Sequence, residues 1–186
     1  MAAADREALA AKLLPLDEAA GMSASGSVDA AVLVPLYGWP ERPGLVFTER
    51  RHDLRRHGGE ISFPGGRRDE GETYLETALR EAHEEIALDP AVVEVVGALP
   101  PIGTFVTNFK VHPIVGLIEA DLSYVASPTE VEAILVFDLD TLRESFAMRR
   151  LVRRGIPIRT PTYVVDDHLI WGATARILGD LLDRLP

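Results

Sequence analysis

The sequence predicts an α/β (α+β) protein in which a mixed β-sheet is sandwiched between helices. Short apolar runs typical of strands lie on both sides of one amphipathic helix, expected at residues 73–88. A second helical pattern, at residues 171–185, closes the chain. Strands before and after a central helix, followed by a terminal helix, favour helical layers on the two faces of one sheet.

The N-terminal segment is expected to be a helical arm. Leu9, Leu13 and Leu14 lie among alanines and charged residues, a pattern that predicts a short helix over residues 3–14, ended by Pro15. Glycine and serine in residues 21–27 predict a connector. We therefore divide the chain into an arm and linker, residues 1–27, and one domain, residues 28–186. The arm should pack on the domain or form a contact in a homodimer.

Seven strands are expected where apolar runs lie between turn-forming residues. The first is a buried run, Ala-Ala-Val-Leu-Val-Pro-Leu, and its neighbour follows across a Trp-Pro-Glu-Arg-Pro turn. The chain contains no internal repeat. The expected strands are residues 30–36, 44–48, 60–63, 92–99, 111–119, 132–138 and 163–165.

Length and composition exclude several classes of protein. A chain of 186 residues is long enough for one domain with a full core. No apolar run approaches the roughly 20 residues that span a bilayer, so we expect no membrane association. The start of the chain lacks a secretory signal pattern, which predicts a cytoplasmic protein. The absence of cysteine excludes disulfides, thiolate metal sites and a cysteine nucleophile.

The charge is acidic overall but locally basic. A formal charge of -10 argues against binding to a nucleic-acid backbone, which requires an electropositive face. One short segment nevertheless concentrates arginines, which suits a small polyanionic ligand. These arginines are Arg50, Arg51, Arg55, Arg56, Arg67 and Arg68.

The central helix carries both its own boundaries and a cluster of carboxylates. Thr73 and Glu76 have the spacing of a capping box, and Asp89-Pro90 predicts the end of the helix. Apolar residues at spacings of three and four form the stripe that packs on the sheet. At about 100° per residue, three glutamates share the flank beside this stripe. They are Glu81, Glu84 and Glu85.

This flank indicates a metal site for magnesium or manganese. Glu81 and Glu85 are a like-charge pair one turn apart, which is unfavourable unless a cation lies between them. Carboxylates without histidine or cysteine favour Mg²⁺ or Mn²⁺ over Zn²⁺. Magnesium commonly binds one or two carboxylates together with substrate phosphates, so a diphosphate is the expected ligand. A solvated acidic face is the alternative, but it does not explain the glycine turn and the capped start of the helix.

The segment resembles the Nudix box, Gly-x5-Glu-x7-Arg-Glu-U-x-Glu-Glu-x-Gly-U, where U is aliphatic. The matching residues are Gly66, Glu72, Arg80, Glu81, Glu84, Glu85 and Leu88. Ala82 replaces a larger aliphatic residue, and Ala87 replaces the second glycine, which puts the geometry of the helix end in doubt. The resemblance implies a Nudix fold, with Glu81 and Glu85 as metal ligands and Glu84 as a third ligand or the general base. It also implies an ion pair between Glu72 and Arg80. In this family the base varies and can lie outside the box.

The residues before the box resemble the coenzyme A pyrophosphatase branch of this family. That motif combines a Leu-Leu-Thr-x-Arg strand with a Gly-x3-Phe-Pro-Gly-Gly loop, and residues 45–50 and 59–66 are similar to it. Residues 168–175 extend the likeness. The resemblance implies hydrolysis of coenzyme A or its derivatives to 4'-phosphopantetheine products and adenosine 3',5'-bisphosphate. Alternatives are hydrolysis of ADP-ribose, NADH or a dinucleoside polyphosphate, or a non-catalytic nucleotide-binding module.

Arginines are the expected ligands of the substrate phosphates, because guanidinium binds phosphate in a planar, bidentate manner. Arg50, Arg51 and Arg55 are the candidates, although each could instead keep a strand edge soluble. Gly65 and Gly66 could let backbone approach a phosphate, or could form a plain turn.

Overall fold

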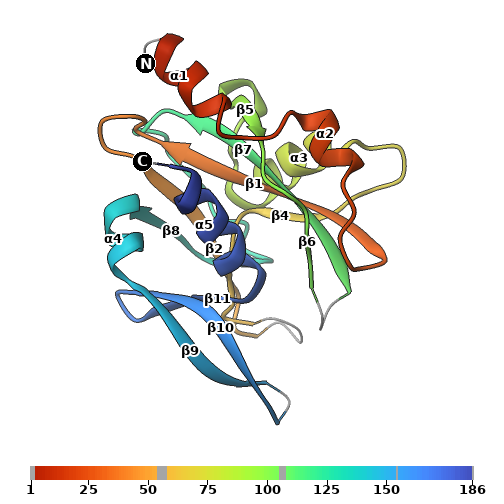
Figure 1. The fold of residues 1–186 in the computed structure, drawn as a ribbon, viewed down its shortest axis with the longest axis vertical. Helices are drawn as coiled ribbons and strands as arrows, with labels where there is room; N and C mark the ends of the chain where they lie inside the picture. Colours follow the sequence, from red (N-terminus) through yellow and green to blue (C-terminus); the bar gives the residue numbers. More distant parts are fainter. Residues whose placement is uncertain (1–2, 54–57, 105–107, 154, 186) are drawn as a thin grey trace.

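The computed structural model describes residues 3–53, 58–104, 108–153 and 155–185. Within these residues, two β-sheets and their helices form the fold (Figure 1). The larger sheet has strands β1 (Val28–Tyr37), β2 (Gly44–Arg50), β3 (Ile61–Ser62), β4 (Gly65–Arg67), β5 (Glu94–Ala98), β6 (Ile102–Gly103), β7 (Phe109–Ile118) and β8 (Val131–Asp138). The smaller sheet has β9 (Phe146–Arg153), β10 (Ile156–Val165) and β11 (His168–Trp171). The helices are α1 (Ala3–Ala10), α2 (Leu16–Gly21), α3 (Tyr74–Ile86), α4 (Leu139–Glu144) and α5 (Gly172–Arg184), with the 3-10 turn η1 (Pro90–Val92).

The larger sheet is mixed, as predicted. Its central strand β1 runs parallel to β7 along its whole length, from Val28 opposite Phe109 to Tyr37 opposite Ile118. β1 also pairs antiparallel with β2 and β4, while β2 pairs antiparallel with β8. A strand covered on both faces is expected to be a nearly continuous apolar run, which explains the composition of residues 30–36.

Two core clusters lie on opposite faces of β1, so the expected sandwich is confirmed. Ala31 and Leu33 pack with Ala82 and other residues of α3. Val34 and Leu36, which alternate with them, pack with Leu178 and other residues of α5. No helix among the described residues is long and apolar enough to cross a membrane.

The N-terminal arm packs on its own domain. Leu9 is fully buried and Leu13 nearly so, in the same cluster as the residues of α5. The backbone N–H of Leu14 donates to Ala98 of β5 at 2.9 Å, and the N–H of Ala98 donates back at 2.9 Å. The helix expected over residues 3–14 ends at Ala10, and α2 was not predicted. The division at residue 27 stays a prediction.

The smaller sheet is the main feature that the sequence did not predict, apart from residues 163–165. Arginines interrupt the apolar alternation of β9, and Pro157 and Pro161 lie in β10. The β9–β10 hairpin projects from the body, where solvent tolerates both residue types (Figure 1). The strand expected at residues 92–99 is also corrected, because η1 comes first and β5 starts at Glu94.

The central helix begins as predicted and ends earlier than predicted. Thr73 and Glu76 form the reciprocal capping box. The helix ends at Ile86, because Ala87 adopts the left-handed conformation with φ 55° and ψ 29°. Asp89 is therefore not part of the helix end, and it accepts a hydrogen bond from the backbone of Ala91 in η1. The second glycine of the box motif corresponds to this left-handed position, where alanine is strained.

The strain at Ala87 gives a stability prediction. Ala87→Gly should raise the free energy of unfolding by about 1 kcal/mol, because glycine has no Cβ penalty at positive φ. Ala91→Gly, in the exposed turn η1, is the control and should lower stability by about 0.5 kcal/mol. Urea unfolding of both variants measures the difference. A destabilised Ala87→Gly protein would contradict the left-handed assignment.

A buried histidine lies beneath the start of the central helix. His112 of β7 is 2% exposed, stacks on Tyr74 with ring centroids 3.5 Å apart, and has no hydrogen-bond partner for Nε2 among the described residues. Burial, followed by the charge of Lys110, lowers the pKa of His112 from 6.5 to about 4. The folded protein therefore holds this imidazole neutral.

This depressed pKa predicts a loss of stability in acid. The unfolded chain takes up a proton at His112 below about pH 6.5, and the folded chain does so only near pH 4. The contribution of His112 to the free energy of unfolding is therefore fully present above pH 6.5 and falls as the pH drops toward 4. The loss should approach about 3 kcal/mol. His112→Phe should remove this part of the acid sensitivity. Urea unfolding between pH 4 and 8 tests it, and parallel curves for the two proteins would refute it.

Candidate active site

The loop before the central helix is fixed by one arginine. Arg80 donates from Nε to Glu72 Oε1 at 2.7 Å and from Nη2 to Glu72 Oε2 at 3.1 Å. Nη2 also donates to the carbonyl of Arg67 at 3.2 Å. The ion pair inferred from the box motif is thus confirmed. Hydrogen bonding to Arg80 lowers the pKa of Glu72 to about 2, which keeps this brace ionised at neutral pH.

The glycine pair lies in β4, directly against the helix carboxylates. β4 pairs with β1, Gly65 opposite Val32 and Gly66 opposite Ala31, although the sequence suggested only a turn here. A Cβ atom on Gly66 would collide with the carboxylate of Glu81. The N–H of Gly65 donates to Glu85 Oε2 at 3.2 Å. Both glycines therefore position carboxylates, and their contact with substrate stays a prediction.

The three helix glutamates differ in burial and in partners. Glu85 is 3% exposed, and burial raises its pKa to about 8. Glu81 is less buried; burial raises its pKa as well, and its Oε1 accepts from Arg80 Nη1 at 2.9 Å. Glu84 is exposed and accepts from the same nitrogen at 3.3 Å. The flank therefore runs from a buried carboxylate to a solvated one.

The donor chemistry of this flank fits a hard divalent cation. Among the described residues no three histidine or acidic side chains form a ready-made metal cluster. Glu85, however, is a buried carboxylate whose described partners are one backbone N–H and the guanidinium of Arg50 at 3.7 Å. A buried charge with so little compensation is unfavourable. A cation held by Glu81 and Glu85, one helical turn apart, would supply the missing charge.

The arginines proposed to bind substrate lie in different environments. Arg50, at the end of β2, lies 3.7 Å from Glu85 and 3.7 Å from Glu130. Arg51 points elsewhere: its Nε and Nη2 donate to Asp53, and its Nη1 donates to the carbonyl of Pro128 at 2.6 Å. Arg55 lies outside the described residues. Of the three, the structure brings Arg50 to the carboxylates and shows Arg51 anchoring a loop.

Glu130 is a site residue that the sequence did not indicate. Its charge contributes to raising the pKa of both Glu81 and Glu85, after the larger effect of burial. Glu130 directly precedes β8. Because Val131 of β8 pairs with Arg50 of β2, Glu130 lies next to Arg50 and the carboxylates. This long-range register leaves no local signal.

The C-terminal motif supports the strands that lead into the site. Thr174 of α5 donates from Oγ1 to the carbonyl of Ile61 in β3 at 3.0 Å, in a buried position. His168 of β11 lies 3.7 Å from Glu49 of β2. Residues 168–175 thus support the β2–β3 segment rather than the carboxylates themselves.

A glycine strand, an arginine-braced loop and a helix flank with one buried and two more exposed glutamates suit an enzyme that hydrolyses acid anhydrides. The NUDIX domain family model matches residues 26–154, and the chain belongs to the Nudix hydrolase family. Members of this family generally use divalent metal ions and act on small molecules.

Relatives and solved structures agree with this membership. An uncharacterized Nudix hydrolase NudL from Enterobacter sp. (strain 638) is 44% identical over 158 residues, which cover 82% of this chain and 80% of the relative. The protein of that name from Escherichia coli O7:K1 is 42% identical over the same shares. A C. elegans Ap4A hydrolase binary complex has a TM-score of 0.51 at 18% identity, covering 61% of this chain and 82% of that one. The M. smegmatis Nudix hydrolase RenU has a TM-score of 0.51 at 20% identity, covering 66% and 76%. These two structures show the shared fold alone.

The burial of Glu85 predicts how metal and pH affect stability. Because its pKa rises on folding, the contribution of Glu85 to the stability of the metal-free protein should fall by a few kcal/mol as the pH rises from about 4.5 to about 8. Glu85→Gln should abolish this loss. Manganese should raise the melting temperature of the wild type but not that of Glu85→Gln.

Thermal unfolding after EDTA treatment, between about pH 4.5 and 8, measures the pH dependence of stability. The same measurement with and without added manganese gives the rise in melting temperature. Glu70→Gln changes an exposed glutamate of the neighbouring loop and should behave as the wild type does. An equal metal-induced rise in Glu85→Gln would contradict the assignment of Glu85 as a ligand.

Proposed function

We propose that this chain hydrolyses the pyrophosphate bond of coenzyme A or a derivative, with Mg²⁺ or Mn²⁺, to 4'-phosphopantetheine products and adenosine 3',5'-bisphosphate. The motif of residues 45–66 is the observation that supports coenzyme A as the class of substrate. It includes β2, β3 and the glycines of β4, and it is followed by α3, which bears the three glutamates. Arg50, the last residue of its first strand, lies at the carboxylates. A substrate that enters along this segment would meet the arginine and the acidic flank together.

Each residue of the site would have a distinct role in this reaction. Glu81 and Glu85 hold the cation, with the more exposed Glu84 as a further ligand or as the base that removes a proton from water. When bound, the metal neutralises phosphate charge and lowers the pKa of a bound water. Arg50 could turn from carboxylate to phosphate, because its ion pairs with the described residues are long, at 3.7 Å. Positioning and charge neutralisation supply most of the catalysis.

The charge of the chain supports a small substrate. The formal charge of -10 disfavours nucleic acid, while a single diphosphate needs only a local cationic site. Hydrolysis of ADP-ribose, NADH or a dinucleoside polyphosphate would use the same carboxylates and differ in the binding loops. A non-catalytic module would have no use for three crowded glutamates on one flank.

A substrate panel tests the branch assignment. Coenzyme A, its oxidised and acylated forms, ADP-ribose, NADH and diadenosine polyphosphates should be compared at equal concentration with Mg²⁺ or Mn²⁺, by release of nucleotide products. We expect the highest kcat/KM for a coenzyme A compound. A preference for any other member would overturn the substrate and leave the family membership intact.

Turnover by variants tests the ligand roles. Glu85→Gln should lower kcat by more than about a hundredfold, because even partners that only orient a metal ligand cost 10- to 100-fold. Glu70→Gln should retain activity. Circular dichroism confirms folding of both proteins. A Glu85→Gln protein with wild-type kcat would exclude Glu85 from the reaction.

A further inference from the structure

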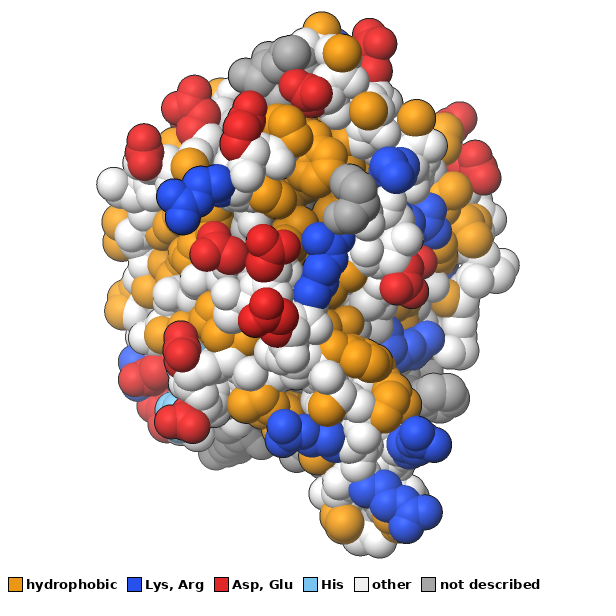
Figure 2. Space-filling model, turned by 60° about the vertical axis from the view of Figure 1, so that its left-hand side comes forward, with side chains coloured by type: hydrophobic (Ala, Val, Ile, Leu, Met, Phe, Trp, Pro, Cys, Tyr) orange, Lys and Arg blue, Asp and Glu red, His pale blue; other side chains and the backbone are white. Residues whose placement is uncertain are grey.

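The β9–β10 hairpin has the opposite charge to the rest of the protein. Residues 145–165 contain five arginines and no aspartate or glutamate. The remainder, with 14 basic and 29 acidic residues, has a formal charge of -15. The hairpin projects from the body in Figure 1, and Figure 2 shows Lys and Arg side chains gathered on this projection without acidic ones. The molecule therefore carries two surfaces of opposite sign.

The hairpin arginines have no counter-charge within the described part of the chain. Arg149, Arg150 and Arg159 are exposed, and the described residues offer none of them an ion pair. Arg150 lies directly opposite Arg159 across the two strands. Like charges in direct cross-strand pairs are unfavourable, and nothing described inside the chain offsets them. Their arrangement suits an anionic surface from outside.

An apolar stripe accompanies these arginines. Phe146, Met148 and Val152 are 50%, 46% and 69% exposed, which makes this hairpin a concentration of large exposed hydrophobic side chains. By the alternation of β9, they share a face with Arg150. Arginines alone could serve to protect a sheet edge from pairing. Exposed phenylalanine and methionine beside arginine instead match the composition of protein interface cores.

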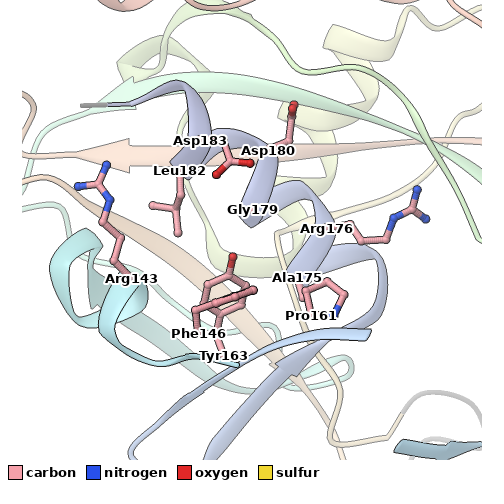
Figure 3. A pocket seen from close by; sticks show the side chains of 10 residues that line it. All are labelled: Arg143, Phe146, Pro161, Tyr163, Ala175, Arg176, Gly179, Asp180, Leu182 and Asp183. Atoms are coloured by element: carbon pink, nitrogen blue, oxygen red, sulfur yellow. The ribbon is translucent and has the colours of Figure 1, made fainter. Parts of the chain in front are cut away.

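The same face continues into a hollow between the hairpin and α5. It encloses about 560 Å³, with walls that include Phe146, Pro161 and Leu182. Figure 3 shows Asp180 and Asp183 of α5 across from Phe146 and Tyr163. Two arginines also line it, but both donate within the chain: Arg143 to the carbonyl of Leu185, and Arg176 to that of Gly103. Asp180 is already paired with Arg184, with Nε and Oδ2 3.1 Å apart. Asp183 is exposed and forms no ion pair among the described residues. The hollow thus offers apolar walls and one carboxylate that is open to a partner.

We infer that two copies of this chain form a two-fold dimer in which the hairpin of each lies across the α5 hollow of the other. One face holds both a projection with arginines and apolar side chains and an apolar hollow lined by the exposed carboxylate of Asp183. A two-fold interface requires such self-complementarity. A free polyanion would leave the apolar stripe uncovered and would be repelled by the acidic body. The inference does not depend on the proposed activity.

The first test is the mass in solution. Light scattering after size exclusion, at up to about 100 μM protein, should give twice the monomer mass of 20.3 kDa. Raising the salt from about 0.1 M to about 1 M shortens the Debye length from about 10 to about 3 Å and should weaken the dimer. A monomer at every concentration in low salt overturns the inference.

The second test is a charge exchange. Arg150→Glu with Arg159→Glu replaces one like-charge pair by another, and Asp180→Arg with Asp183→Arg reverses the hollow. Each double variant alone should be monomeric, because the substituted face of the hairpin would meet Asp183, and the substituted hollow would meet the hairpin arginines. Mixed together, they should form a heterodimer, since both contacts regain opposite charges.

A matched control separates the effect of the exchanged positions from the effect of a change in net charge. Arg6→Glu with Arg42→Glu makes the same change in net charge as the hairpin variant, at exposed sites outside both the hairpin and the lining of the hollow, and should remain dimeric. Circular dichroism confirms that each variant is folded. Dimers that survive both double variants, or a mixture that stays monomeric, would show that the hairpin and hollow do not form the interface.

Discussion

The site depends on one unfavourable arrangement, a carboxylate buried with less positive charge around it than it needs. Glu85 receives a backbone N–H from Gly65 and a distant guanidinium from Arg50, and burial raises its pKa to about 8. Its neighbours on the helix are partly satisfied by Arg80, whereas Glu85 is not. A folded domain can retain such a group when the rest of the structure fixes it. We propose that an affinity for a divalent cation follows from that deficit.

The sheet fixes the helix, and the helix fixes the carboxylates. β1 pairs with β7 over ten residues and with β4 at the glycines, and its two faces contact α3 and α5. The glycine strand, the Arg80 brace and the capped start of α3 are therefore all held in place by β1. Arg50 at the end of β2 and Glu130 before β8 come from distant parts of the chain and lie next to the carboxylates that this arrangement fixes.

Local signals were enough to predict the helix that carries the glutamates, and long-range pairing explains what was missed. The capping box, the apolar stripe and the Glu72–Arg80 pair all lie within one segment. Residues 65–67 resembled a turn because only pairing with β1 makes them a strand. Glu130 reaches the site through the β2–β8 register. Arg51 lies just beyond the end of β2 and is held by Asp53 and Pro128, so it separates from Arg50. The early end of α3 depends on the positive φ of Ala87, which alanine does not signal because a left-handed residue at a helix end is usually glycine.

The hydrogen bond from Thr174 to Ile61 has a consequence for how this protein can be divided. The segment recognised as the family domain stops at residue 154, yet Leu178 and Leu181 of the terminal helix are fully buried in the principal core cluster. Cutting the chain at that limit would open the core and remove a support of the strand before the glycine pair. The unit of sequence similarity is thus smaller than the unit of folding, and grafts or chimaeras must carry the last helix along.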